Sequence, residues 1–182
     1  MEITTKQVLR ILYILSWIIF TGICIETGGT MFASFYTLVI NSVNAKHFWP
    51  GIDLSNLYAY DHGQFLAETI HMIMPAIFRA ILFYLIMKIL HDKKLDMTQP
   101  FNKEMGRFIF RISYLSFIIG LLSWWGVKYT EWLISQGVKM PDIQHLGLGG
   151  ADVWMFMGVT LYVIAQIFKR GIEIQTENDL TI

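Results

Sequence analysis

Residues 70–90 read IHMIMPAIFRAILFYLIMKIL, an apolar stretch in which Arg79 and Lys88 are the charged side chains. A helix of this length and polarity matches one crossing of a hydrocarbon layer about 30 Å thick. Two further runs of similar character follow at 108–127 and 153–168, and a longer one precedes at 8–43. The sequence therefore predicts four transmembrane helices in a single domain, at about 8–43, 64–90, 104–127 and 152–168.

The composition supports this membrane architecture. Hydrophobic residues make up 54% of the 182 residues and charged residues 15%, against about 25% charged in soluble domains. Mean hydropathy is +0.48. The formal net charge of zero provides no electrostatic footprint for nucleic acid, so we expect no direct nucleic-acid binding. The single cysteine, Cys24, excludes an intrachain disulfide and a cysteine-based zinc ribbon.

The first apolar run is too long for a cleaved signal peptide, so we interpret it as a retained helix. About 33 residues at 1.5 Å each give roughly 50 Å of helix, against a layer of about 30 Å. Either the helix tilts and projects outside the membrane, or Gly28-Gly29 interrupts it. The sequence leaves both alternatives open.

Charge distribution predicts the orientation. Basic residues gather before the first span, between the second and third, and after the fourth: Lys6, Arg10, Lys93, Lys94, Lys103, Arg107, Arg111, Lys169 and Arg170. The other two connections hold Lys46, Lys128 and Lys139. The positive-inside rule then places both termini and the middle loop in the cytoplasm, and the tryptophans agree, at the opposite interface: Trp49, Trp124, Trp125, Trp132 and Trp154. We expect a multi-pass membrane protein, N-in and C-in.

The connections carry local signals. Trp49-Pro50-Gly51 is typical of a turn, and Asp53 or Ser55 is a plausible helix cap after it. Apolar Leu54, Leu57, Tyr58, Phe65 and Leu66 alternate with polar residues, which suggests a short amphipathic segment lying on the outer membrane surface. Asn102 is placed to cap the third long helix. The fold class is thus an all-α integral membrane four-helix bundle with a short outer amphipathic segment.

Helical spacing groups polar and small residues on three faces. Gly22, Glu26, Gly29 and Ala33 share one face of the first helix, and Glu68, His71, Pro75 and Arg79 one face of the second. Ser113, Ser116, Gly120 and Ser123 form a stripe on the third, which we interpret as packing. The first two faces are expected to point into the bundle, and Pro75 to kink its helix.

Glu26, Arg79, His71 and Glu68 form the candidate intramembrane polar site. Counted from the basic anchors, Glu26 and Arg79 differ by about 10 Å in backbone height, and their side chains lean toward each other. Charges inside a membrane are functional hypotheses by default, but an ion pair that only fixes helix register explains the pair equally well. For His71 a neutral interface histidine with one hydrogen bond is the better interpretation.

The residues predict neither an enzyme nor a metal or cofactor site. His62, Glu68 and His71 match no recognised zinc spacing, and His71 is the one histidine within a span, which disfavours a bis-histidine haem. The chain has no Walker loop, Gly-x-Ser-x-Gly or HExxH motif. The lysines of the middle loop most simply determine topology, and contact with anionic membrane lipid is secondary.

The sequence resembles the bacterial domain-of-unknown-function family 2975, small four-helix membrane proteins, over nearly the whole chain. The resemblance rests on Phe83-Tyr84-Leu85, Lys88-Ile89-Leu90, Pro100-Phe101-Asn102-Lys103-Glu104 and above all the closing KRGIEIQTENDLTI of 169–182. The resemblance implies no catalytic residues, because the family has no established activity. Members are often encoded beside a small helix-turn-helix regulator, which implies a cytoplasmic transcriptional regulator as a partner.

We therefore expect a non-enzymatic membrane sensor or regulatory partner whose polar interior responds to a ligand, lipid or proton. The alternative is a small oligomeric transporter or permease-like protein that uses Glu26 and Arg79 along its path; a homo-oligomer would then be required, because four spans leave little room. The acidic cytoplasmic tail at 169–182 is a candidate docking segment for a partner, through Glu173, Glu177, Asn178 and Asp179.

Overall fold

The computed structural model describes residues 5–92 and 102–179 of the chain, and the regular structure there is helical. The elements in order are α1 (Thr5–Val39), the 3-10 helix η1 (Ser42–His47), α2 (Ser55–Tyr60), α3 (His62–His91), α4 (Lys103–Ser135) and α5 (Ala151–Asp179). By length and composition, α1, α3, α4 and α5 are each able to cross a membrane. The all-α class and the four long apolar helices are thus confirmed.

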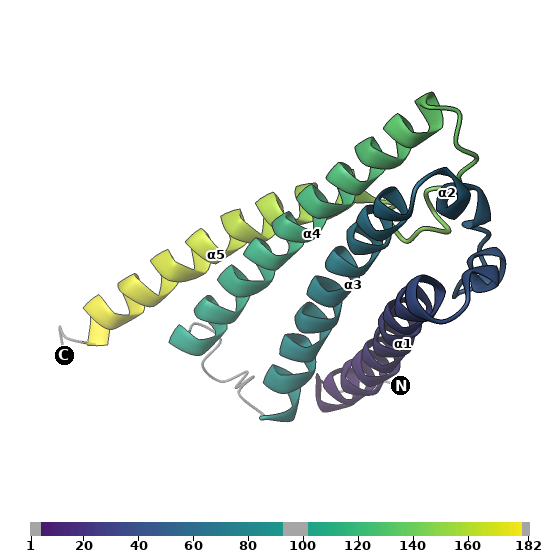
Figure 1. Ribbon diagram of the computed structural model, residues 1–182. Helices are drawn as coiled ribbons and strands as arrows, with labels where there is room; N and C mark the ends of the chain where they lie inside the picture. Colours follow the sequence, from purple (N-terminus) through teal and green to yellow (C-terminus); the bar gives the residue numbers. More distant parts are fainter. Residues whose placement is uncertain (1–4, 93–101, 180–182) are drawn as a thin grey trace.

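The four long helices form an open row (Figure 1), so the arrangement as a four-helix bundle is not confirmed. Among the described residues α1 packs on α3, α3 on α4 and α4 on α5, while α1 touches neither α4 nor α5, and α3 does not touch α5. Apolar side chains in lipid gain little from closing around a common axis, because lipid tails are as apolar as leucine. Each helix pair is held instead by its own close-packed seam.

The seam between α4 and α5 is the small-residue stripe of α4, whose packing role is confirmed. Ser113, Ser116 and Ser123 are buried, and the Ser113 hydroxyl donates a hydrogen bond of 2.8 Å to the Gly158 carbonyl. A Cβ added to Gly120 would lie 2.7 Å from the Met155 backbone nitrogen. The two backbones approach so closely only because these positions carry small side chains.

Helix α1 is continuous through Gly28-Gly29, which resolves the alternative left open by its length. Its 35 residues correspond to about 52 Å of helix, longer than a membrane core. The excess length packs under the connection that follows it, because Gly29 lies directly beneath the Trp49 indole and Ala33 is buried. The first helix therefore extends beyond the span to support structure at one end of the row.

That structure is a compact cap, formed by residues 40–72 and 126–150 at the end of the row where α2 lies (Figure 1). Its core consists of Ala33, Phe48, Ile52, Leu54, Leu57, Phe65, Met72, Leu133, Val138, Leu146 and Leu148. Leu54, Leu57 and Phe65 are fully buried, so the apolar side of the predicted amphipathic segment packs against the protein, and its position on the membrane surface stays a prediction. The connection at 136–150 folds back and contributes Leu146 and Leu148, which cover these apolar side chains.

Local signals in the cap are read well from the sequence. The Trp49-Pro50-Gly51 turn is present, with Gly51 at φ +98° and a cis Trp49-Pro50 peptide bond. The Asp53 carboxylate accepts hydrogen bonds from the Ser55 backbone N–H at 2.9 Å and from the Ser55 hydroxyl, and these bonds lower the pKa of Asp53. At the start of α4, outside this compact structure, the predicted helix N-cap is also confirmed: the Met105 backbone N–H donates to the Asn102 side-chain oxygen at 2.7 Å.

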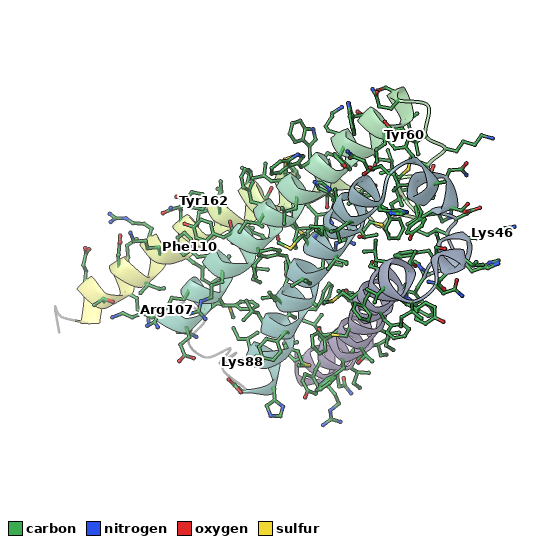
Figure 2. All side chains as sticks on the ribbon, viewed as in Figure 1. Lys46, Tyr60, Lys88, Arg107, Phe110 and Tyr162 are labelled. Atoms are coloured by element: carbon green, nitrogen blue, oxygen red, sulfur yellow. The ribbon has the colours of Figure 1, made fainter. Side chains whose placement is uncertain are left out.

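The helix ends differ from the predicted spans. α4 continues to Ser135 rather than stopping near 127, and α5 continues to Asp179 rather than 168. The predicted tail is therefore mostly the end of α5, with the Ile172 side chain against Gly106 of α4. Lys46 and Tyr60 lie at the cap, whereas Lys88 and Arg107 lie at the opposite end of the row, called here the basic end (Figure 2).

Candidate functional site

Glu26 of α1 and Arg79 of α3 line one small cavity where these helices meet the cap. Its cap-side walls include Pro50 and the segment His145, Leu146 and Gly147. The cavity volume is about 30 Å³, enough for one or two water molecules. The structure thus brings together the two charged residues that the sequence singled out, and adds a third titratable side chain, His145.

Arg79 is bound to the cap rather than to Glu26. One guanidinium nitrogen donates a hydrogen bond to the Gly147 carbonyl, and the buried Nε has no partner among the described residues. The ion pairs within 4.0 Å in the described part of the chain, Lys128–Glu131 and Arg170–Glu173, lie elsewhere. Glu26 therefore faces Arg79 across the cavity, and the two side chains do not form a contact ion pair.

Gly147 is able to reach Arg79 because of its backbone conformation. It has φ +70° and Gly150 has φ +75°, values that residues with a side chain rarely adopt. Nearby, a Cβ on Gly126 of α4 would lie 2.8 Å from the Leu148 side chain, so this glycine makes room for the returning connection. Our sequence reasoning missed the 143–150 segment, although its Gly147-Leu148-Gly149-Gly150 run is a signal for close backbone approach.

The predicted inward face of α1 is only partly correct. Gly29 and Ala33 pack against the cap, but a Cβ added to Gly22 would meet no other part of the protein within 4 Å, and Glu26 is exposed at the side of the row. The buried stripe of α1 carries hydroxyl groups instead: Ser16, Thr27, Thr30, Ser34 and Thr37. Each hydroxyl donates to a carbonyl one turn earlier in α1, so these side chains can be buried without any other partner.

Glu68 belongs to a different polar group, between α3 and α4. It is fully buried, and its Oε1 accepts a hydrogen bond of 2.6 Å from the Thr130 hydroxyl. The other carboxyl oxygen has no partner among the described residues. Close by, the Tyr129 hydroxyl donates to the Gln64 side-chain oxygen. The four predicted site residues therefore separate into a Glu26–Arg79 cavity and a Glu68 cluster.

His71 is part of the Glu68 side of the molecule. Its ring stacks on Tyr129 with 4.7 Å between ring centroids, and its Nδ1 lies 2.8 Å from the Ala67 carbonyl. A carbonyl only accepts, so Nδ1 carries the proton and donates this bond. This is the single-hydrogen-bond interface histidine expected from the sequence. α3 runs unbroken through Pro75, and the kink at this residue stays a prediction.

The three residues considered for zinc do not converge. His62 stacks on Tyr58 with 4.2 Å between centroids, Glu68 is bonded to Thr130, and His71 faces Tyr129. Among the described residues no group of three His, Cys, Asp or Glu side chains is arranged to hold a metal ion.

The candidate docking residues lie at the free end of α5. Glu173 forms an ion pair of 3.1 Å with Arg170 one turn earlier. Glu177 is exposed, while the side chains of Asn178 and Asp179 lie outside the described part of the chain. Because this segment is helical, Ile172 packs on α4 whereas Ile174, two residues later, is exposed.

Comparison with known proteins identifies one family. A family model described as a protein of unknown function, DUF2975, matches residues 41–182, which is well over half of the chain. This range includes the cap, α3, α4 and α5. Neither a search of curated proteins nor a search of solved structures finds a match.

Proposed function

Given that the chain belongs to this family of proteins of unknown function, we propose that it is a non-enzymatic membrane sensor whose cap controls the contact between α1 and α3. The observation that carries the proposal is the hydrogen bond from Arg79, inside a span-length helix, to the Gly147 carbonyl of the cap. The main contact of this buried guanidinium is a loop carbonyl. The position of the loop and the environment of the charge between the helices therefore depend on each other. A ligand or proton that moves the 143–150 segment would release Arg79.

The released guanidinium has an alternative partner across the cavity. Glu26 lies on the opposite wall, and a charged group inside a membrane is costly unless it is paired. Loss of the Gly147 bond would therefore favour a direct Arg79–Glu26 ion pair. Since α3 is the one long helix that α1 contacts among the described residues, this exchange would shift α1 against the rest of the row.

Orientation is part of the proposal. Lys88, Arg107 and Arg111 lie at the basic end, with Lys169 and Arg170 on the neighbouring part of α5, whereas the cap connections hold Lys46 and Lys139. The positive-inside rule then puts the basic end and both termini in the cytoplasm of a bacterial cell and the cap outside the inner membrane. The cap would thus sample the exterior, and the end of α5 would face cytoplasmic partners.

A cytoplasmic helix-turn-helix regulator is the partner that we propose for the end of α5. The exposed Ile174 and the acidic residues Glu173 and Glu177 offer an apolar position flanked by negative charge. Deleting residues 173–182 should abolish co-purification of the regulator while leaving the thermal midpoint of the membrane part unchanged. Unchanged co-purification would reject this docking site.

The test of the sensor proposal uses Arg79→Ala, Glu26→Gln and the double variant in the full chain. We expect Arg79→Ala to raise hydrogen exchange at residues 143–150 and to change reporter output while the helical content is retained. The matched control is Lys128→Gln, an exposed cap-end lysine in an ion pair with Glu131. If both single variants only lower stability and the double variant recovers it, the pair is structural and the sensor proposal fails.

A small oligomeric transporter is the second candidate, and the exposure of Glu26 favours it. A carboxylate at the side of a span-length helix normally faces a protein interior or a wet cavity, so a second copy packed on α1 would supply that environment. The cavity of about 30 Å³ admits water or a proton but no larger solute within one chain. Proton flux in proteoliposomes that disappears in a correctly folded Glu26→Gln variant would favour transport.

A further inference from the structure

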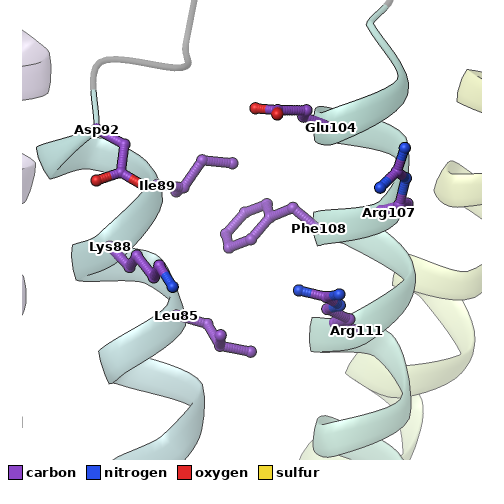
Figure 3. A pocket seen from close by; sticks show the side chains of 8 residues that line it. All are labelled: Leu85, Lys88, Ile89, Asp92, Glu104, Arg107, Phe108 and Arg111. Atoms are coloured by element: carbon purple, nitrogen blue, oxygen red, sulfur yellow. The ribbon is translucent and has the colours of Figure 1, made fainter.

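A second, larger cavity lies at the basic end, between the last turns of α3 and the first turns of α4 (Figure 3). Its volume is about 180 Å³, and it is separate from the residues that line the Glu26–Arg79 cavity. Three cations line it: Lys88 from α3, and Arg107 and Arg111 from α4. Two neighbouring helices thus contribute positive charge to the same space.

The cavity carries an excess of positive charge. Asp92 and Glu104 also line it, so among the described residues of the lining the cations outnumber the carboxylates. The ion pairs found in the described part of the chain join Lys128 to Glu131 and Arg170 to Glu173. Within that part, therefore, no carboxylate lies within ion-pair distance of Lys88, Arg107 or Arg111, and their donors remain available to an anion.

The walls of the cavity are apolar as well as charged. Figure 3 shows Phe108 and Arg111 reaching from α4 toward α3, and Leu85 and Ile89 reaching back from α3. Leu85 lies one turn deeper along α3 than Lys88, so apolar surface continues from the charged rim toward the middle of the row. Charge at a rim with apolar surface beneath it matches an amphiphile better than a fully soluble anion.

We propose that this cavity binds a phosphate ester group, with the head of an anionic phospholipid as the source that the apolar wall favours. A phosphodiester carries one negative charge, which suits a cavity whose described lining has more cations than carboxylates. Arg107 and Arg111 would donate to the phosphate oxygens in forked pairs, and Lys88 would act as a point charge from the other side. The acyl chains would follow Leu85 and Phe108. A free phosphate ester has the same head chemistry and is the second source to distinguish.

The experiment is a native mass-spectrometry titration of the full chain in mild detergent. Phosphatidylglycerol and phosphatidylcholine with identical acyl chains are the probes, with inorganic phosphate and glycerol 3-phosphate as soluble competitors. We expect phosphatidylglycerol to bind at least tenfold more tightly than phosphatidylcholine. Arg111→Gln and Lys88→Gln should each weaken phosphatidylglycerol binding about fivefold, as expected for removing one cation near a lipid head.

Lys169→Gln is the matched control, because it removes one exposed positive charge near the same end without touching the cavity. It should leave phosphatidylglycerol affinity unchanged, and the charge-preserving Arg111→Lys should retain most of it. Displacement of phosphatidylglycerol by glycerol 3-phosphate would identify a soluble phosphate ester as the ligand, and no displacement would identify the lipid. Equal weakening of phosphatidylglycerol binding by Lys169→Gln would overturn the site. It would also be overturned if neither phosphatidylglycerol nor glycerol 3-phosphate bound more tightly than phosphatidylcholine.

Discussion

Phe65→Ala should open the cap while leaving the helical row intact. Phe65 is fully buried, with its ring edge-on to Phe48 at 5.8 Å and to Tyr58 at 5.3 Å between centroids. Truncating a buried phenylalanine to alanine costs about 3–5 kcal/mol from lost burial and the cavity left behind. That range already covers two aromatic contacts of about 0.5–1.5 kcal/mol each.

Hydrogen exchange read residue by residue measures this loss. The Leu54 amide donates to the Ala45 carbonyl at 2.8 Å and the Ile52 amide to the Phe48 carbonyl at 2.9 Å, so both report on the cap. A loss of 3 kcal/mol lowers their protection on the order of a hundredfold. Protection near Ser113 of α4, whose hydroxyl donates to the Gly158 carbonyl of α5, should change less than threefold, because this part of the seam lies outside the cap core.

Phe156→Ala is the matched control, because this ring is 75% exposed on α5. The same truncation there should cost less than about 0.5 kcal/mol. The argument for a separately packed cap fails if Phe65→Ala lowers cap protection less than tenfold, or if protection falls equally along the whole row. A large effect of Phe156→Ala would show instead that this face of α5 is covered by another chain.

Four further outcomes are expected. Gly120→Ala should lower the thermal midpoint, because its Cβ would meet the Met155 backbone, whereas Gly28→Ala, with no neighbour within 4 Å, should raise it; equal shifts would contradict the seam. Asn102→Ala should cost about 1 kcal/mol of unfolding free energy in a detergent titration, and no cost would mean that the cap bond is immaterial. Glu68→Gln should be at least as stable as the parent, because its amide oxygen still accepts the hydrogen bond from Thr130 and the side chain carries no charge. A drop in thermal midpoint would show instead that the carboxyl group of Glu68 is needed for stability. The stability gap between the parent and Asp53→Ala should be present at neutral pH and close as the pH falls through the lowered pKa of Asp53, below its ordinary 3.8; a gap independent of pH would exclude the carboxylate as its source.

Local features of the fold could be predicted because they depend on neighbouring residues. The apolar runs define four helices of span length, Asn102 caps α4, and the spacing of Ser113, Ser116, Gly120 and Ser123 predicts a packing seam. The helix ends at Ser135 and Asp179 were placed too early, because the prediction gave each helix the length of one membrane crossing, and that length does not limit where a helix ends.

Features that depend on distant parts of the chain were missed. The open row depends on which helices pack against each other, and a single sequence contains no signal that says which of the predicted packing faces meet. The cap core needs Leu146 and Leu148, two apolar residues in a glycine-rich connection that resembles an ordinary loop. At the site, sequence spacing identified Glu26 and Arg79, but the true partner of Arg79 is a backbone carbonyl, which carries no side-chain signature. The face of α1 was misplaced because glycine was taken as the packing residue where serine and threonine pack.

The row of helices that touch only their neighbours also determines how the chain can assemble during synthesis. Each long helix contacts the one made just before it, so α3 can dock on α1, α4 on α3 and α5 on α4 as each leaves the ribosome. The cap forms later than the contacts between the long helices. Its bonds from Thr130 to Glu68 and from Arg79 to Gly147 join residues 62 and 68 positions apart, so it cannot close until residues near 150 have been made. Completion of the cap is therefore a late event, which requires α1, α3, α4 and the connection after α4 to have been made.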